Sequence, residues 1–157
     1  TTKATCEADG VRTYTCSVCG DLTVDQLTES LLPFNCYEWQ MLQLTNRERY
    51  RENLNPLTGF ALMQRFADIR ALESVGYYNQ HIRPDGSSYR TVAEEIGLTG
   101  YTALQENLSW AYEYPQKPKP DPVMHMTGWM NSDAHRAGIL KPSFTSVGIG
   151  LEQNKNR

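Results

Sequence analysis

The stretch Trp129-Met-Asn-Ser-Asp-Ala-His-Arg-Ala-Gly-Ile-Leu140 is the part of this sequence that says most about its fold. Upstream of it, Pro122 predicts the start of a last helix, because proline is favoured in the first helical turn. The stretch contains His135, one of three histidines in the chain. Imidazole packs and caps helices as readily as it binds metals, so His135 alone does not define a functional site. Its meaning depends on the other segments of the chain.

Hydrophobic periodicity and turn residues predict those other segments. A first helix should run from about Tyr37 until Asn53-Leu-Asn-Pro56, since proline disfavours a helical conformation in the residue before it. A second helix, with an apolar stripe near helical spacing, should cover 57–75 and end at Gly76. We also expect a short helix at 92–96, an extended buried piece at 106–112 and an alternating strand at 144–151.

The bulk composition is typical of one globular domain. The chain has 157 residues, of which 39% are apolar and 21% charged, and its mean hydropathy is -0.56. No run approaches the roughly 20 consecutive apolar residues of a membrane-spanning helix. The net charge is -3 and the isoelectric point is near 5.6, whereas phosphate-binding proteins usually have an isoelectric point above about 9. We therefore expect no transmembrane segment and no nucleic-acid partner.

The cysteines divide the chain unevenly. Cys6, Cys16 and Cys19 are crowded near the start, Cys36 follows alone, and the long remainder has none. This distribution predicts a small Cys-rich module at 1–24, a linker at 25–36 and a main domain at 37–157 that depends on its apolar core. The form Cys16-Ser-Val-Cys19-Gly20 suits a structural zinc site with Cys6 as a third ligand, and a disulfide within the group is the alternative.

One acidic residue makes the histidines more informative. Glu106 interrupts a stretch that otherwise reads as buried, and buried carboxylates are rare unless they pair with a charge or bind a metal. If His81, Glu106 and His135 converge, two imidazoles and a carboxylate suit Zn²⁺ or a similar divalent cation. The carboxylate could equally act as a base on water. The three residues lie far apart in sequence, so spacing does not establish that they meet.

Several motifs occur in a fixed order and resemble one known family. They are Leu42-x-Leu-Thr-Asn-x-Glu-Arg49, Asn53-Leu-Asn-Pro-Leu57, Ala67-x-x-Arg-Ala71, His81-x-Arg-Pro-Asp-Gly86, Glu106-Asn-Leu108, the stretch at 129–140 and Val147-Gly-Ile-Gly150. Together they resemble the bacterial extracellular branch of the CAP superfamily, the SCP-like domains. The resemblance covers about 38–151 and implies an α+β fold, a three-layer α-β-α sandwich, with the Cys-rich module as an appendage.

The resemblance also implies a cleft formed by two histidines and two acids. His81 and His135 match the family's histidines, and Glu106 matches the acid of its Glu-Asn motif. The second acid of eukaryotic members has no counterpart here, so the polar Ser132 is expected in the cleft instead. Arg136 follows His135 directly and could hold an anionic ligand or form a surface ion pair. The chain stops at Arg157, so we expect the domain to lack the final core strand of bacterial members.

These expectations define a function to test. The resemblance implies an exported or cell-surface domain with a divalent cation, most simply Zn²⁺, in its cleft. We expect a binding or signalling module for an extracellular lipid, glycan, peptide or partner protein, because a fold alone does not license a reaction. A metal-assisted hydrolase with His81, Glu106 and His135 as catalytic residues is the first alternative, and a structural surface domain is the second. His125 should be structural and lie outside the cleft, and Trp129 should be buried.

Overall fold

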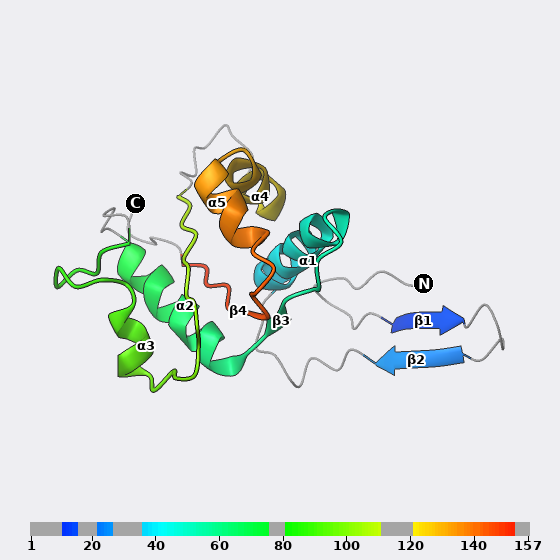
Figure 1. The fold of residues 1–157 in the computed structure, drawn as a ribbon, viewed down its shortest axis with the longest axis horizontal. Helices are drawn as coiled ribbons and strands as arrows, with labels where there is room; N and C mark the ends of the chain where they lie inside the picture. The colour runs from blue at the N-terminus through cyan, green and yellow to red at the C-terminus, as the bar shows by residue number, and fades with distance from the viewer. Residues whose placement is uncertain (1–10, 16–21, 27–35, 76–80, 111–120, 153–157) are drawn as a thin grey trace.

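A computed structural model describes residues 11–15, 22–26, 36–75, 81–110 and 121–152 of the chain, and it has an α+β architecture (Figure 1). Helices dominate the part from residue 36 onward, where the strands are short. The elements in chain order are β1 (Val11–Thr15), β2 (Leu22–Gln26), α1 (Cys36–Arg51), β3 (Thr58–Gly59), α2 (Ala61–Ser74), α3 (Thr91–Glu95), α4 (Pro122–Met130), α5 (Asp133–Ile139) and β4 (Ser146–Val147).

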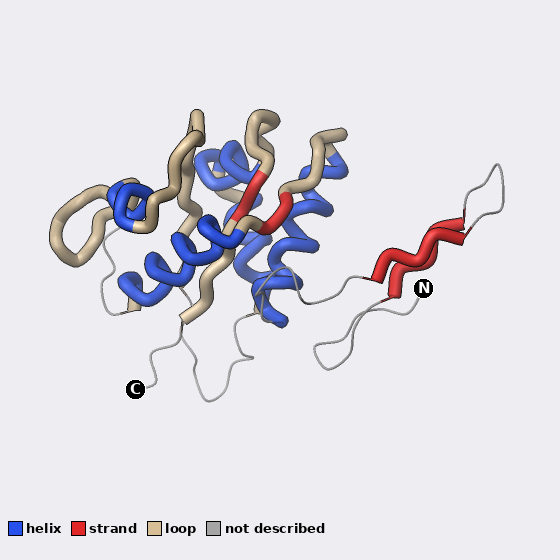
Figure 2. The backbone as a smooth tube through the Cα atoms, turned by 90° about the horizontal axis from the view of Figure 1, so that it is seen from below, coloured by secondary structure: helices blue, strands red, loops and turns tan. Residues whose placement is uncertain are grey.

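The first two strands form a hairpin. β1 pairs antiparallel with β2, in a register that joins Val11 to Gln26 and Thr15 to Leu22. Figures 1 and 2 show this hairpin beside the helical part of the chain. The predicted domain boundaries at 24 and 36 stay predictions.

Two apolar clusters form the core of the described helices. Around α2 and α3 the buried residues are Phe66, Tyr89, Val92, Ala93, Ile96, Leu98 and Leu104. Around α1, α4 and α5 they are Met41, Met126 and Ile139, with Tyr37 and Trp129 packed against them. No helix in the described part of the chain is long and apolar enough to cross a membrane.

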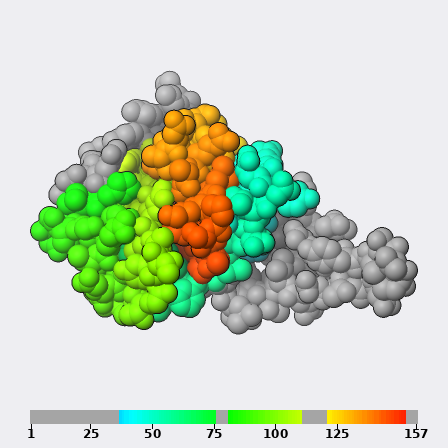
Figure 3. Space-filling model, in the orientation of Figure 1, coloured from blue at the N-terminus to red at the C-terminus, as the bar shows by residue number. Residues whose placement is uncertain are grey.

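The parallel pair of β3 and β4 lies between these two groups of helices (Figures 1 and 2). Thr58 pairs with Ser146, and Gly59 pairs with Val147. The segment after β4 lies flush on α2, because the Gln64 amide donates to Ile149 O at 2.7 Å and accepts from Ile149 N at 3.0 Å. A Cβ at Gly148 would overlap the backbone carbonyl of Met63, so this approach requires glycine. Figure 3 shows the segment running between α1 and the residues near 100.

A buried arginine fixes the α1 side of the fold. Arg49 has no exposed surface, and its guanidinium donates four hydrogen bonds at 2.7–3.2 Å to backbone carbonyls. The acceptors are the carbonyl oxygens of Asn55, Ile139, Lys141 and Phe144. Arg49 therefore ties α1 to the end of α5 and to the segment that leads into β4. Burial without a carboxylate partner lowers the pKa of Arg49 from its ordinary value.

The structure corrects three sequence predictions. The second helix begins at Ala61 rather than near residue 57, because Thr58 and Gly59 pair with β4 and Phe60 has an extended backbone. The helix predicted from Pro122 is present as α4, but it is not the last one, because the short helix α5 follows it after Asn131 and Ser132. The strand predicted at 144–151 is regular only at 146–147, since Gln64 rather than a neighbouring strand satisfies the backbone of Ile149.

Candidate functional site

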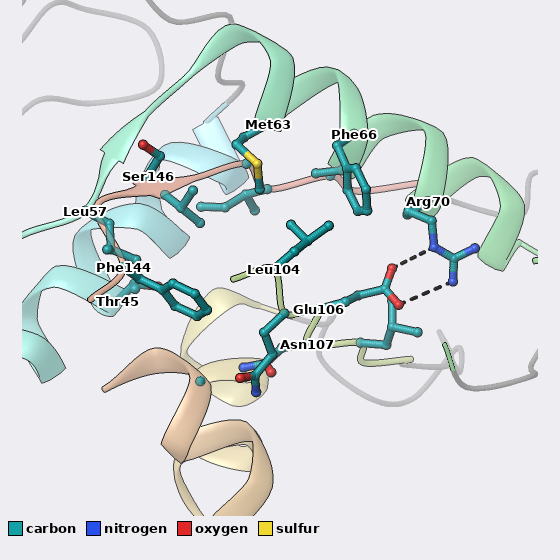
Figure 4. A pocket seen from close by; sticks show the side chains of 18 of the residues that line it. Thr45, Leu57, Met63, Phe66, Arg70, Leu104, Glu106, Asn107, Phe144 and Ser146 are labelled. Carbon is teal, nitrogen blue, oxygen red and sulfur yellow. Dashed lines mark hydrogen bonds and ion pairs between the residues drawn. The ribbon is translucent and has the colours of Figure 1, made fainter. Parts of the chain in front are cut away.

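Glu106 is the centre of the most strongly paired polar group in the described structure. It follows buried Leu104 in an irregular segment, and its side chain is only 7% exposed. Arg70 Nε donates to Glu106 Oε1 at 2.7 Å, and Arg70 Nη2 donates to Oε2 at 3.4 Å (Figure 4). His81 Nδ1 lies 2.9 Å from Oε2. Both carboxylate oxygens of Glu106 are therefore engaged by protein groups.

Arg70 comes from α2 and is 97% buried by the packing around it. Besides Glu106 it contacts Glu73, one helical turn further along, at 2.6 Å. Burial alone would lower the pKa of Arg70, but the hydrogen bonds and charges of Glu106 and Glu73 outweigh it and raise that pKa. A charged guanidinium thus lies behind Glu106.

The pairing continues from Glu73 to the loop that carries His81. Arg83 Nε and Nη2 donate to Glu73 Oε1 at 2.8 and 2.6 Å, and Nη2 also contacts Glu95 at 2.8 Å. These hydrogen bonds to Glu73 raise the pKa of Arg83. We call His81, Glu106, Arg70, Glu73, Arg83 and Glu95 the charge chain. Two of its members, His81 and Arg83, lie in the same loop, because they are two residues apart in the sequence.

The His81 loop is a closed turn with an unusual backbone. His81 has a φ of 62°, in the left-handed region that non-glycine residues seldom adopt. Its carbonyl accepts from Tyr89 N at 3.0 Å, and Arg83 N donates to Ser87 O at 2.8 Å. The Pro-Asp-Gly residues form a turn, in which Gly86 N donates to Arg83 O at 2.9 Å and Ser87 donates to Asp85 Oδ1. The His81 side chain remains 42% exposed.

His135 lies on α5 and is connected to the Glu106 segment through its backbone. Asn107, the residue after Glu106, donates its side-chain amide to His135 O at 3.1 Å. Ser132 precedes α5, and its side chain makes no capping hydrogen bond. Arg136 lies 3.7 Å from Glu52, and both side chains are about half exposed, which is the weak surface ion pair considered as an alternative.

The predicted ligands therefore divide into a pair and a separate residue. The structure brings His81 and Glu106 into contact. Across the described ranges, no three His, Cys, Asp or Glu side chains come close enough to form a metal-binding group. A three-ligand site of His81, Glu106 and His135 stays a prediction. Cys6, Cys16 and Cys19 lie outside the described residues, so their zinc site or disulfide stays a prediction as well.

The pair itself has the chemistry of a metal-binding histidine. A ligating imidazole usually binds the ion with one nitrogen while its other N–H donates to a carboxylate, which fixes the tautomer and ring orientation. Glu106 occupies that position behind Nδ1 of His81. The donor set thus fits a divalent cation at Nε2, with further ligands from residues such as His135 or from solvent.

Sequence reasoning did not identify Arg70, Glu73 and Arg83 as parts of the site. Arg70 appeared only as a position in a family motif. A usable signal was present, because Arg70 and Glu73 have the spacing of neighbours on one helix face and Arg83 follows His81 closely. The contact from Arg70 to Glu106 spans 36 residues, and no local pattern encodes it.

A groove of ≈ 1050 Å³ adjoins the charge chain (Figure 4). Arg70 and Glu106 line it together with apolar side chains that include Phe66, Leu104 and Phe144. Neither His81 nor His135 lines it in the described structure.

His125 lies on the wall of this groove, and its predicted place outside a cleft of His81, Glu106 and His135 stays a prediction. The buried ring contacts Ser109 Oγ at 2.6 Å and packs edge-on against Tyr37. Burial lowers the pKa of His125, and the charge of Asp121 partly opposes this. Trp129 is half-buried rather than buried, and its Nε1 donates to Leu108 O at 3.1 Å.

Comparisons with known proteins match this architecture. The model of the cysteine-rich secretory protein family, CAP, matches residues 42–157. The uncharacterized protein YkwD of Bacillus subtilis is 28% identical over 122 residues, which are 76% of this chain and 44% of that protein. The chain therefore spans less than half the length of this relative.

Two solved structures share the fold. An extracellular protein containing an SCP domain from Bacillus anthracis aligns over 86% of this chain and 44% of its own, with a TM-score of 0.65 and 24% identity. A cysteine-rich secretory protein from Staphylococcus aureus aligns over 84% of this chain and 40% of its own, with a TM-score of 0.60 and 20% identity. The predicted α+β fold of SCP-like domains is confirmed.

Proposed function

Because the chain belongs to the cysteine-rich secretory protein (CAP) family, we propose that it is an extracellular binding module in which His81 presents Nε2 to a divalent cation. The cation would lie at His81, beside the groove that Arg70 and Glu106 line, and that groove would take a lipid, glycan or peptide. The extracellular location is supported by the Bacillus anthracis protein of the same fold, which is an extracellular protein. The ligand class follows from the groove, which combines an apolar wall with the paired charges of Arg70 and Glu106.

The engagement of Glu106 carries this proposal. Its Oε1 accepts from Arg70 at 2.7 Å, and its Oε2 lies 2.9 Å from His81 Nδ1. Both carboxylate oxygens are therefore already occupied by protein groups, which leaves Glu106 poorly placed to accept a proton from a water molecule. Glu106 is therefore better suited to orienting His81 than to acting as a general base. This favours binding over the metal-assisted hydrolysis that the sequence left open.

Zn²⁺ is the cation we propose, with His81 and His135 as its protein ligands and Ser132 nearby. Imidazole nitrogen suits zinc, and solvent or the bound molecule would complete the coordination. Glu106 would act through His81, and such outer carboxylates raise the basicity of the histidine they contact. The backbone link from Asn107 to His135 supports a cleft between the Glu106 segment and α5.

Calorimetric titration of Zn²⁺ into the full chain tests the proposal. We expect His81→Ala and His135→Ala each to weaken binding by at least about tenfold, because each removes one ligand. His125→Gln is the matched control, since it removes a histidine that contacts Ser109 instead. A parallel titration of the Cys6→Ser, Cys16→Ser, Cys19→Ser variant separates any zinc held by the cysteines.

The titrations distinguish a zinc site in the cleft from a zinc site on the N-terminal cysteines. Binding lost in both site variants and kept in the His125 and cysteine variants supports the cleft site. Binding that survives the double variant of His81 and His135 but disappears with the cysteines contradicts it, because the cation would then belong to the N-terminal module.

A further inference from the structure

We infer that Arg70 is a positioning residue that holds Glu106 so that His81 keeps its proton on Nδ1 and offers Nε2 as an acceptor. The same arginine, through Glu73 and Arg83, anchors the loop on which His81 lies. The consequence for cation binding rests on the proposed function, whereas the effect on the His81 ring does not.

The first support is the geometry around Glu106. Arg70 approaches the carboxylate through two nitrogens, which sets the plane of the carboxylate as a single point contact could not. With Oε1 held at 2.7 Å, the carboxylate has Oε2 directed to His81 Nδ1 at 2.9 Å. An ionised carboxylate only accepts hydrogen bonds, so Nδ1 must be the protonated nitrogen of this pair.

The second support is that the charge chain contacts the His81 loop at two residues. His81 is held by Glu106, and Arg83 is held by Glu73 at 2.6 and 2.8 Å. Arg70 contacts both of those carboxylates. A loop held at positions two residues apart, from one buried side chain, has little freedom to rotate the ring between them.

The third support is the backbone of His81, which has a φ of 62°. Left-handed conformations of non-glycine residues are unfavourable and persist where the surroundings enforce them. Hydrogen bonds of the loop to itself supply part of this restraint, through Tyr89 and Ser87. The charge chain supplies the part that connects the loop to α2.

The four least exposed charged members of the charge chain carry balanced charges, and Glu95, its third carboxylate, is 52% exposed. Arg70 and Arg83 are two cations, and Glu73 and Glu106 are two carboxylates, all at most 16% exposed. Replacing Arg70 by an uncharged residue would leave two buried carboxylates with one cation.

Nuclear magnetic resonance of the histidine ring nitrogens in the full chain, without metal, tests the inference. The spectra are recorded about two pH units above 6.5, where an ordinary imidazole is neutral. We expect His81 to have its proton on Nδ1 in the unmodified chain. In Arg70→Met we expect a shift toward the Nε2–H tautomer, and zinc affinity about 10- to 100-fold lower. Arg70→Lys keeps the charge without the two-nitrogen contact, so it should restore the tautomer in part.

Two further variants keep the test decisive if Arg70→Met does not fold. Arg83→Gln, at a side chain that is 14% exposed, cuts the outer link and should change the His81 ring signals less than Arg70→Lys does. Arg49→Lys alters a buried arginine with carbonyl partners only, so it should lower the melting temperature and leave the His81 tautomer unchanged.

A His81 tautomer that is the same in the unmodified chain and in every folded Arg70 variant overturns the inference. So does a tautomer change of equal size in Arg49→Lys, because it would mean a general loosening. Failure of zinc to bind would overturn the proposed function and leave the tautomer result to judge Arg70 separately.

Discussion

Two buried arginines, Arg49 on α1 and Arg70 on α2, stabilise the two sides of this domain in different ways. Arg49 donates to four neutral backbone carbonyls and has no carboxylate partner in the described contacts. Arg70 donates to the carboxylates of Glu106 and Glu73. Both guanidiniums are almost fully shielded from solvent, yet the pKa of Arg49 is lowered and that of Arg70 is raised.

This difference distinguishes an arginine that stabilises the fold from an arginine that belongs to the candidate site. A guanidinium that donates to backbone carbonyls joins backbone segments to one another, so its removal lowers the free energy of unfolding. A guanidinium that neutralises a carboxylate next to an exposed imidazole sets the geometry of a group that can bind something. The variants described below test this contrast.

The largest effect is expected from Arg49→Met. It leaves up to four buried carbonyls without donors, each worth about 1–3 kcal/mol, and water will reach some of them. We expect the free energy of unfolding to fall by about 4 kcal/mol and the melting temperature by roughly 10 °C. Arg51→Met is the control on the same helix, since Arg51 is 60% exposed and pairs only with Glu48. A loss under about 1 kcal/mol for Arg49→Met would contradict the scaffold role.

A smaller loss is expected where the two sides meet, at Gly148. Gly148→Ala places a Cβ against the carbonyl of Met63, and the backbone of the segment after β4 must move away from α2. We expect a loss of about 2–3 kcal/mol by chemical denaturation. Gly128→Ala is the opposite case, because Gly128 is helical with no atom near the added Cβ, and it should gain about 0.5–1 kcal/mol. An equal change in the free energy of unfolding at the two glycines would mean that the segment after β4 does not pack directly against α2.

The elements themselves were mostly predictable from local patterns, whereas their junctions were not. The helix predicted from Tyr37 begins at Cys36, and the short helix predicted at 92–96 is observed at 91–95, because each has periodicity and clear ends. The start of α2 and the break between α4 and α5 depend on pairing with β4 and on a turn at Asn131. The pairing with β4 is a tertiary contact that overrides helix propensity, whereas the turn at Asn131 is local.

The site was also predictable only in part, because local motifs identify some of its residues and long-range contacts determine the others. His81 and Glu106 were identified from the family motifs, and they are in contact. Arg70 was not identified, because its role depends on a contact across 36 residues. His125 reads as an isolated histidine between methionines, and nothing local indicates that it faces the groove.

The smallest predicted effect is a pH dependence on the α1 side, from His125. Burial lowers its pKa in the folded chain below about 6.5, so the unfolded chain binds more protons as pH falls through that value. Stability should therefore be complete above about 6.5 and decrease as pH falls toward the folded pKa, by at most about 1.4 kcal/mol per pH unit. His125→Gln should flatten this part of the curve measured by thermal unfolding. An unchanged slope in that variant would assign the dependence to another group.

The distinction between the two arginines is tested most directly by measuring zinc affinity and melting temperature together in Arg49→Lys and Arg70→Lys. Our account predicts that Arg49→Lys lowers the melting temperature and leaves the zinc dissociation constant within about twofold of the unmodified chain. It predicts that Arg70→Lys raises that constant by about tenfold, beyond what its loss of stability explains. Equal losses of zinc affinity in both variants would contradict the account, because the two arginines would then differ only in position.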